Sequence, residues 1–409
     1  MSRFGPAGQF DQQCNPVKKA AGGWFVLTQS AHYIVRMRIL PLSPTAAWSD
    51  AMPALFGRMA TLNVGVIGDF ALDLYYQLNT ETGEYSLETN RPVYWGSRPK
   101  ASLGAAGNVI QNLLALGVGQ VWAVGVVGAD LFGHAMRQLM QERGVNTDHL
   151  LTAPTGWDTC VYTKPMQQQA EANRIDFGSQ NKLPDHDFDQ LLNGLAQLLP
   201  QLDVLVINQQ FPCPLLTEAR LPALNERIRQ HPAVCCLADL RHSGLLIRGA
   251  TLKVNTAELA RCRKVTLPSH PDLDWCIEHA RLLNQELGGP LVVTRGEAGM
   301  LYVRDDDIWS IDGLEVSGPL DTVGAGDTVV AALAASLSAG ALPPQALTIA
   351  NLAAAVTVQK LGQTGTATPD ELYQLATTYT PHEPPIPSAA SSGTASSPDP
   401  STSSVLGKP

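Results

Sequence analysis

The stretch that most constrains the fold is an almost uncharged run of helix-forming residues, Thr328–Gly340, which follows a glycine-containing turn. Its side chains are mostly those of Ala, Val and Leu, which favour a helix packed inside the protein rather than one at the surface. Gly340 and the prolines at 343 and 344 are typical of the place where such a helix ends. The sequence therefore predicts a buried helix after residue 327.

The turn in front of this helix reads Asp321-Thr-Val-Gly-Ala-Gly-Asp327. Glycines at 324 and 326 allow a tight turn and bring backbone N–H groups close to a ligand. A helix N-terminus offers unpaired N–H donors and the positive end of a dipole, which together favour phosphate. Because a negatively charged carboxylate does not bind phosphate, Asp327 is interpreted as a base. It would take a proton from a hydroxyl that attacks a phosphoryl group. An Asp that merely caps a core helix is the simpler alternative.

Strand-like and helix-like segments alternate through the middle of the chain. This alternation predicts an α/β fold with a parallel sheet covered by helices on both faces. With 409 residues and 44% apolar residues, the chain can form a sizeable core. We expect an N-terminal extension at 1–47, one domain at 48–378, and a disordered tail rich in Pro, Ser and Thr at 379–409. The polar segment around 78–100 is expected to form a small antiparallel flap.

Candidate ligand-binding residues lie where the first predicted strand, 63–68, ends. Asp69 and Asp73 follow this strand, and ligands of open α/β sheets bind at the carboxyl ends of the strands. Carboxylates accept hydrogen bonds from sugar hydroxyls, so a polyhydroxyl ligand is predicted, with solvated turn acids as the alternative. Gly104 and Ala105 permit a close approach of the backbone to a ligand. Asn108 either binds a hydroxyl or caps the helix that begins there.

Two further motifs follow β-prone runs in the second half of the chain. Asn255-Thr-Ala-Glu258 comes after one such run, although an Asn and a Glu at this spacing could simply begin a helix. Leu291–Gly299 reads as a buried strand followed by a glycine turn. Either an ordinary β-turn or a loop near a nucleotide fits the second motif, and the nucleotide loop is favoured because the Asp321 motif follows shortly after it.

In this order the motifs resemble those of the ribokinase (PfkB) family of sugar and nucleoside kinases. The stretch 321–327 resembles the second family signature, and Leu103–Val109 resembles the first, with Ala105 where glycine is usual. The resemblance covers roughly residues 62 to 377. It implies a ribokinase-like three-layer α/β/α sandwich with a mostly parallel central sheet and a small β-lid that covers the sugar.

The resemblance also implies a role for each motif residue. These roles are Asp327 as catalytic base; Gly324, Ala325 and Gly326 as anion hole; Asp69, Asp73, Gly104, Ala105 and Asn108 as sugar-binding residues; Thr294, Gly296, Gly299 and Asn351 as nucleotide-binding residues; Asn255 and Glu258 as Mg²⁺-organising residues acting through water; and Asp321 as part of a site for a monovalent cation such as K⁺. For Asn351, a surface or capping role is the alternative.

Within the family, the sequence is most similar to the bacterial heptose-7-phosphate kinases. Gly68–Asp73, 104–108 and 350–369 carry this likeness. It implies transfer of the γ-phosphoryl group of ATP to a sugar or sugar phosphate. Many of these kinases are fused to a nucleotidyltransferase, whose His-x-Gly-His motif does not occur in this sequence. A ribokinase-, fructokinase- or nucleoside-kinase-like enzyme, and a relative that binds its ligands without turnover, remain alternatives.

Composition narrows the choice of partners and compartment. The net charge is −9 and no basic cluster stands out, which argues against a nucleic-acid surface. Seven cysteines without a Cys-x-x-Cys motif indicate neither a zinc site nor a disulfide framework, so a cytoplasmic enzyme with reduced thiols is expected. No apolar run reaches the length of a membrane span, and no membrane partner is expected. By resemblance to the family, the lid is expected to supply a homodimer contact.

Overall fold

The computed structural model describes residues 36–40, 46–168, 170–361 and 364–379. Most of the segments 1–47 and 379–409, for which an extension and a disordered tail were expected, lie outside these residues. Within the first segment, residues 36–40 form a strand, and residues 46 and 47 begin a helix, α1. All of the described residues fall in one compact unit.

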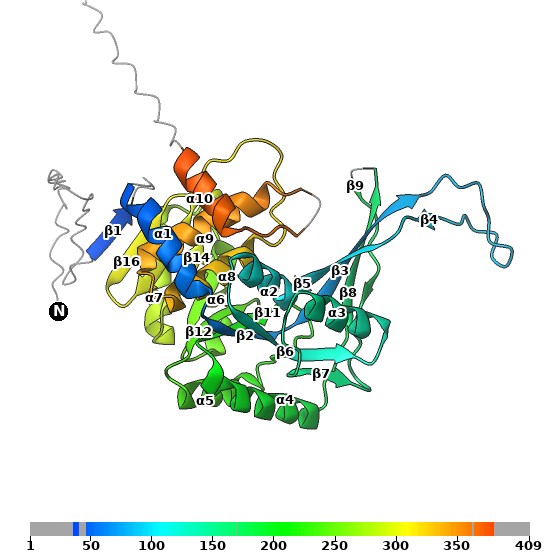
Figure 1. Cartoon of the computed structure of the whole chain (residues 1–409), viewed down its shortest axis with the longest axis horizontal. Coiled ribbons are helices and arrows are strands. Elements are labelled where there is room, and N and C mark those ends of the chain that lie inside the picture. The colour runs from blue at the N-terminus through cyan, green and yellow to red at the C-terminus, as the bar shows by residue number, and fades with distance from the viewer. Residues whose placement is uncertain (1–35, 41–45, 169, 362–363, 380–409) are drawn as a thin grey trace, which may run out of the picture. The chain divides into compact units, whose positions relative to one another are not determined.

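A ten-stranded sheet forms the centre of the domain, with the strand order β1-β16-β15-β14-β13-β12-β11-β2-β6-β7 (Figure 1). Its strands are β1 (Arg36–Leu40), β2 (Asn63–Gly68), β6 (Gln120–Gly128), β7 (Leu150–Ala153), β11 (Val204–Gln209), β12 (Cys235–Leu240), β13 (Thr251–Asn255), β14 (Leu291–Thr294), β15 (Met300–Arg304) and β16 (Asp307–Ile311). Neighbouring strands run parallel except that β15 is antiparallel to both β14 and β16. The predicted mostly parallel sheet is confirmed.

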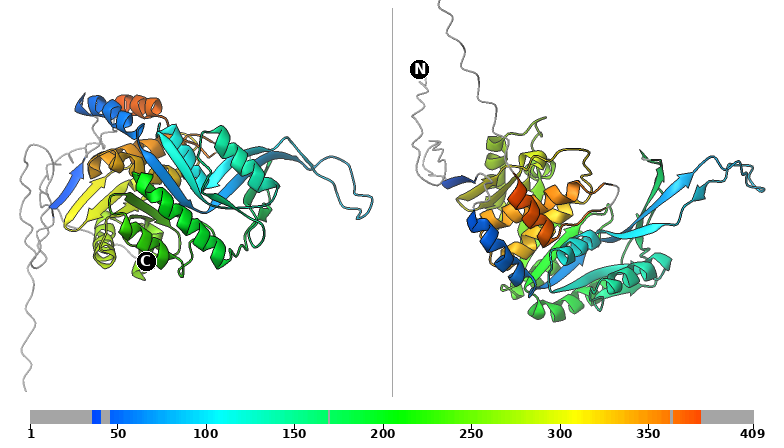
Figure 2. Two further views of the ribbon diagram at one scale, coloured as in Figure 1. Left: turned by 60° about the horizontal axis from the view of Figure 1, so that its bottom comes forward. Right: turned by 45° about the horizontal axis from the view of Figure 1, so that its top comes forward.

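Helices cover both faces of this sheet, which gives three layers (Figure 2). One face packs against α1 (Ala46–Met59), α2 (Ala106–Ala115), α3 (Leu131–Glu142), α8 (Ala325–Ser338), α9 (Pro343–Val358) and α10 (Pro369–Thr378). The other face packs against α4 (Asp185–Leu198), α5 (Leu221–Gln230), α6 (Thr256–Arg263) and α7 (Leu273–Leu287). None of the helices in the described ranges is long and apolar enough to cross a membrane.

The buried helix predicted after residue 327 is α8, and it begins at Ala325. Residues 328–336 of this helix are all buried, because the neighbouring α9 and α2 and the face of the sheet surround it. Gly340, two residues after the helix, has a positive φ of 83°, which is typical of the left-handed conformation just past a helix end. The position of α8 fixes its N-terminal turn near the carboxyl ends of β11 and β12.

A second, smaller sheet lies beside the large one. Its strands are β3 (Phe70–Asn79), β4 (Trp95–Gly96), β5 (Lys100–Ala105), β8 (Cys160–Gln167), β9 (Ala170–Glu171) and β10 (Asp176–Phe177). The central strand β3 pairs with β5 on one side and with β8 on the other. The first residues of β3 are buried and its last residues reach solvent, where β3 and β4 extend away from the large sheet (Figure 1). The flap is therefore more extensive than the residues 78–100 expected from sequence.

A close approach joins the two sheets at Gly125 of β6. A Cβ atom built on Gly125 would lie 2.6 Å from two carbon atoms of the Phe70 ring, which is buried in the core. We predict that Gly125→Ala destabilises the fold by about 1–3 kcal/mol, because the methyl group must displace the ring. The matched control is Gly57→Ala in the exposed face of α1, where nothing lies within 4 Å of an added Cβ. There alanine should stabilise by about 0.5–1 kcal/mol through helix propensity. Urea unfolding of both variants measures whether the free energy of unfolding falls for Gly125→Ala and rises for Gly57→Ala.

Candidate active site

The N-terminal turn of α8 begins at Gly324, which needs to be glycine for two reasons. Its φ is 82°, in the left-handed region that side chains disfavour. A Cβ atom at this position would also lie 2.7 Å from Asn108 Nδ2 and 2.8 Å from Thr364 Cγ2. The N–H of Ala325 donates to the carbonyl of Thr322 at 3.2 Å. Helix geometry leaves the next N–H groups without acceptors inside the helix, so they are available to an anion.

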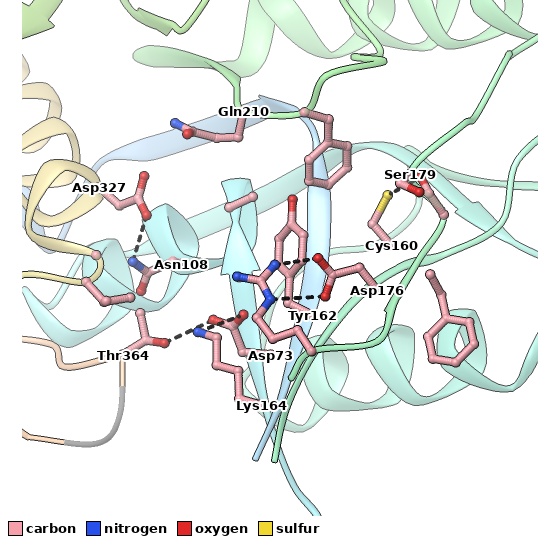
Figure 3. Close-up of a pocket in the computed structure, with 18 of the residues that line it drawn as sticks. Asp73, Asn108, Cys160, Tyr162, Lys164, Asp176, Ser179, Gln210, Asp327 and Thr364 are labelled. Carbon is pink, nitrogen blue, oxygen red and sulfur yellow. Dashed lines mark hydrogen bonds and ion pairs between the residues drawn. The ribbon is translucent and has the colours of Figure 1, made fainter. Parts of the chain in front are cut away.

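Asp327 is the third residue of α8, and its carboxylate faces the start of α2. Asn108 Nδ2 donates a hydrogen bond to Asp327 Oδ2 at 2.8 Å (Figure 3). Burial raises the pKa of Asp327 to about 7, the Asn108 hydrogen bond opposes this rise, and the nearby Asp239 carboxylate adds to it. A carboxyl group with a pKa near neutrality can hold or release a proton at physiological pH.

A fixed positive charge lies next to this turn. Lys253 Nζ forms a buried ion pair with Asp239 Oδ2 at 3.2 Å. The ammonium would lie 3.4 Å from a Cβ atom built on Gly326. Burial acts to lower the pKa of Lys253, but the Asp239 and Glu258 carboxylates outweigh it, so the pKa is raised and the side chain stays charged. This pair carries no local sequence signal, because Asp239 lies in β12 and Lys253 in the neighbouring strand β13.

A cavity of about 480 Å³ lies between the small sheet and α8. The predicted residues that line it are Asp73, Gly104, Ala105, Asn108, Gly324 and Asp327. Other residues that line it are Tyr162, Lys164, Arg174, Asp176, Gln210, Phe211, Arg241 and Thr364. Figure 3 shows many of these polar side chains arranged around one space, with Asp327 and Asn108 at one end and Asp176 and Tyr162 at the other.

Two pairs of oppositely charged side chains lie in this first cavity. Asp73 Oδ1 lies 3.2 Å from Lys164 Nζ, and Asp73 Oδ2 accepts a hydrogen bond from Thr364 Oγ1 at 3.2 Å. Burial acts to lower the pKa of Lys164, but the Asp73 carboxylate and the Tyr75 hydroxyl together outweigh it, so the pKa is raised. Arg174 forms a bidentate pair with Asp176, at 3.1 and 2.5 Å. These contacts preorganise donors and acceptors for a polar ligand.

Ala105, at the start of α2, adopts an unusual backbone conformation. Its φ is 52° and its ψ is −128°, a combination that glycine adopts more readily than alanine. Holding a residue with a side chain there costs on the order of 1–3 kcal/mol. The strain occurs where β5 turns into α2, next to Gly104, whose missing side chain leaves room for the carboxylate of Asp73.

A second cavity, of about 390 Å³, lies on the other side of the α8 N-terminus. Predicted residues that line it are Thr294, Gly296, Gly299, Ala325, Gly326 and Asn351. Its remaining lining is largely apolar and includes Leu314, Val316, Val329 and Val358. Asn351 Nδ2 donates to the carbonyl of Asp312 at 2.7 Å, so its amide also has a structural role. An apolar chamber that opens onto helix N–H groups suits a flat base joined to phosphates.

The predicted metal residues line neither of these two cavities. Asn255 caps α6 and forms a capping box with Glu258, each side chain accepting the backbone N–H of the other at 2.8 Å. The second Glu258 oxygen lies 4.0 Å from Arg261. Within the described residues, no group of three or more His, Cys, Asp or Glu side chains could hold a metal. This second oxygen of Glu258 fits a hydrated Mg²⁺ that is bound mainly by phosphates. Asp321 Oδ1 accepts the N–H of Val323 at 3.0 Å.

Asp69 is placed differently from its neighbour Asp73. It is completely buried and does not line the first cavity. Both of its carboxylate oxygens accept backbone N–H groups of the loop after β11. Burial raises the pKa of Asp69 to about 6, and these hydrogen bonds oppose the rise.

Sequence reasoning missed several residues that line the first cavity. Gln210 and Arg241 follow directly after β11 and β12, so the strand-end rule that selected Asp73 would also have found them. Arg174 and Asp176 belong to a polar stretch that the sequence alone does not distinguish from an exposed surface segment. Lys164 and Thr364 carry no local signal, because their neighbours in space are far away in sequence.

Solved structures share this architecture. Phosphofructokinase-2 from Escherichia coli, crystallised in complex with potassium, superposes with a TM-score of 0.63 and 17% identity over 78% of this chain and 99% of that one. Ribokinase from Arabidopsis thaliana, complexed with ribose and ATP, gives a TM-score of 0.58 and 16% identity over 78% and 100%. At these identities the likeness concerns the fold, and the fold is that of a ribokinase-like α/β protein.

Sequence comparison is more specific. Residues 67–370 match the model of the pfkB family carbohydrate kinases, and the chain belongs to this family. The bifunctional protein HldE of Paramagnetospirillum magneticum is 34% identical over 313 residues, and that of Trichlorobacter lovleyi is 32% identical over 323 residues. These alignments cover 75% and 78% of this chain but only 61% and 64% of the two relatives.

The raised pKa of Asp327 predicts a stability gain when its charge is removed. Because the folded-state pKa of about 7 exceeds the ordinary value of 3.8, ionisation of this carboxyl opposes folding. The loss of stability sets in above about pH 4 and is complete above about pH 7. Asp327→Asn keeps an oxygen for Asn108 and should stabilise by on the order of 2 kcal/mol at pH 8. Chemical unfolding of both proteins at pH 4 and pH 8 checks this. An equal difference at the two pH values contradicts it.

Proposed function

We propose that this protein is an ATP-dependent carbohydrate kinase that transfers the γ-phosphoryl group to a sugar phosphate of the heptose-7-phosphate type. The observation that carries the proposal is the position of Asp327. Its carboxyl lines the first cavity, while the two residues before it, Ala325 and Gly326, line the second. A base placed at the junction of two cavities can serve a hydroxyl in one and a phosphoryl group in the other.

The proposed reaction is a direct, in-line transfer. Asp327 takes the proton of the acceptor hydroxyl as its oxygen forms a bond to the γ-phosphorus, and the bond from that phosphorus to the bridging oxygen breaks to release ADP. The N–H groups at the start of α8 and the ammonium of Lys253 stabilise the negative charge that develops on the transferred group. Asn108 orients the Asp327 carboxylate by its hydrogen bond.

The charge of the first cavity supports a phosphorylated sugar as the substrate. Lys164, Arg174 and Arg241 all line it. Within the described part of the chain, Arg241 forms no ion pair, and its Nη2 donates to the side chain of Gln210 at 2.9 Å. A guanidinium without a carboxylate partner suits a phosphate group on the sugar. The likeness of residues 68–73, 104–108 and 350–369 to heptose-7-phosphate kinases supports the same substrate class.

Kinases of this family use ATP with a divalent metal, and bound Mg²⁺ neutralises the charge of the phosphates. We assign Glu258 and Asn255 to hold its water shell, since Glu258 Oε1 has only a 4.0 Å ion pair with Arg261 in the described residues. The turn at Asp321 is proposed to accept a monovalent cation, as the potassium complex of phosphofructokinase-2 suggests by its fold relationship. Comparing activity in potassium and in tetramethylammonium salts tests that site.

The small sheet is proposed to mediate a homodimer. Its projecting part exposes large apolar side chains, among them Leu87 at 100% and Trp95 at 55% exposure. Exposed apolar groups of this size gathered on one flap are typical of a protein interface. Sedimentation velocity of the wild type and of Leu87→Glu measures whether the protein is a dimer and whether the substitution dissociates it.

The proposed function predicts which substrate is preferred and what happens when the base Asp327 is replaced. Given ATP and Mg²⁺, the protein should release ADP with heptose 7-phosphate faster than with ribose, fructose or adenosine. Asp327→Asn should lower kcat by on the order of 10²–10⁴ while nucleotide binding persists, because only the proton acceptor is lost. The wild-type kcat/KM should fall as the pH drops below about 7, as Asp327 becomes protonated. The matched control Asp203→Asn changes an exposed carboxylate at the opposite end of β11. Full activity of Asp327→Asn would refute the assignment.

A second prediction separates the two roles of Glu258. Glu258→Gln retains the capping box, because glutamine serves in that motif as well as glutamate. The unfolding temperature should therefore stay unchanged, whereas the Mg²⁺ concentration for half-maximal activity should rise on the order of tenfold. Titrating activity with Mg²⁺ after chelator treatment measures this, with Glu286→Gln, an exposed residue paired with Arg263, as control. An unchanged Mg²⁺ requirement contradicts the metal assignment.

A further inference from the structure

Asp69 holds a loop that forms one wall of the sugar cavity. Its Oδ2 accepts the N–H groups of Gln210 at 2.8 Å and Phe211 at 3.0 Å, and its Oδ1 accepts that of Leu215 at 2.7 Å. The side chain is 0% exposed. Both oxygens are therefore occupied by backbone donors, and no face of the carboxylate is open to a ligand.

The loop that Asp69 holds lies between β11 and α5 and has no regular structure around Pro212 and Pro214. Its first residues, Gln210, Phe211 and Pro212, line the first cavity. The Phe211 ring packs edge-on against Tyr162, with the ring centroids 6.2 Å apart. Within the described ranges this loop has no strand or helix partner, so its N–H groups depend on side-chain acceptors. The Asp69 carboxylate accepts three of these N–H groups.

The backbone of Asp69 adds two further links. Its N–H donates to the carbonyl of Asn208 in β11 at 3.2 Å, and its carbonyl accepts the N–H of Ala106, the first residue of α2, at 2.8 Å. Two residues further along α2 lies Asn108, which binds Asp327. One residue thus joins the wall of the cavity at 210–212 to the helix that orients the predicted base.

We propose that Asp69 is a positioning residue for the sugar substrate, which acts by fixing the loop 210–215 and not by contacting the ligand. The kinetic part of this inference rests on the proposed kinase function, whereas the structural part does not. Asparagine cannot replace the side chain, because its amide NH₂ would face a backbone N–H donor where the carboxylate offers an acceptor.

The first experiment needs no substrate. Residue-resolved hydrogen exchange of the wild type should show slow exchange for the N–H groups of residues 210, 211 and 215. In Asp69→Asn the N–H groups that face the amide NH₂, either those of residues 210 and 211 or that of residue 215, should exchange at least tenfold faster, while the N–H of Ala123 in the central sheet keeps its protection. The control Asp203→Asn removes a carboxylate that accepts the N–H of Asn63 at the opposite end of β2 and β11. It should leave the loop protected. Fast exchange of the three groups in the wild type overturns the proposal, even if Asp69→Asn does not fold.

The second experiment compares kinetic constants. Asp69→Asn should raise KM for the sugar phosphate on the order of tenfold and leave KM for ATP within twofold, because the loop lines the first cavity and contributes no residue to the second. A general loss of structure would instead lower kcat and the unfolding temperature with both KM values unchanged, which would overturn the positioning role. If the wild type transfers no phosphoryl group to any sugar tested, the proposed function fails, and the exchange experiment still decides whether Asp69 holds the loop.

Discussion

The structure depends on one unfavourable placement, a carboxyl group in a largely buried position at the first turn of α8. A helix N-terminus stabilises a negative charge through its dipole and free N–H groups, but burial opposes ionisation more strongly, so the pKa of Asp327 rises. Contacts from neighbouring elements reduce the free-energy cost of holding this charge in a buried position. Asn108 donates to the carboxylate from α2, Lys253 places a positive charge beneath the turn, and Gly324 allows α2 to approach.

A similar compensation of charge occurs in the first cavity, where two acids are each paired with a base. Asp73 with Lys164 and Asp176 with Arg174 are contacts between elements of the small sheet and its connections. Each pair keeps partly buried charges compensated without a ligand, and each still has donors and acceptors to spare. A polar ligand can then exchange hydrogen bonds with these groups at little cost in reorganisation, which is the condition for a preorganised site.

The sequence predicted those parts of the fold and site that are encoded locally. The α8 turn, the alternating strands and helices, and the residues that line the cavities from 104–108 and 294–299 belong to contiguous motifs, so their geometry follows from short-range rules. Lys164 and Thr364 could not be found this way, because only tertiary packing brings them to Asp73. Asp69 and Asp73 both follow the first predicted strand, yet only Asp73 lines the first cavity. The rule that ligands bind at strand ends says nothing about which way a side chain points in the turn that follows.

One contact has a consequence for biosynthesis. Thr364, which donates to Asp73 Oδ2, stands 291 positions after it in the chain. A ribosome must therefore translate almost the whole domain before the cavity can be completed, and until then the large sheet lacks α8 and α9 over one face. Domains generally fold as units during synthesis, and exposed apolar surface makes incomplete chains prone to aggregate. Nascent chains of this protein should accordingly depend on chaperones until α8 and α9 have left the exit tunnel.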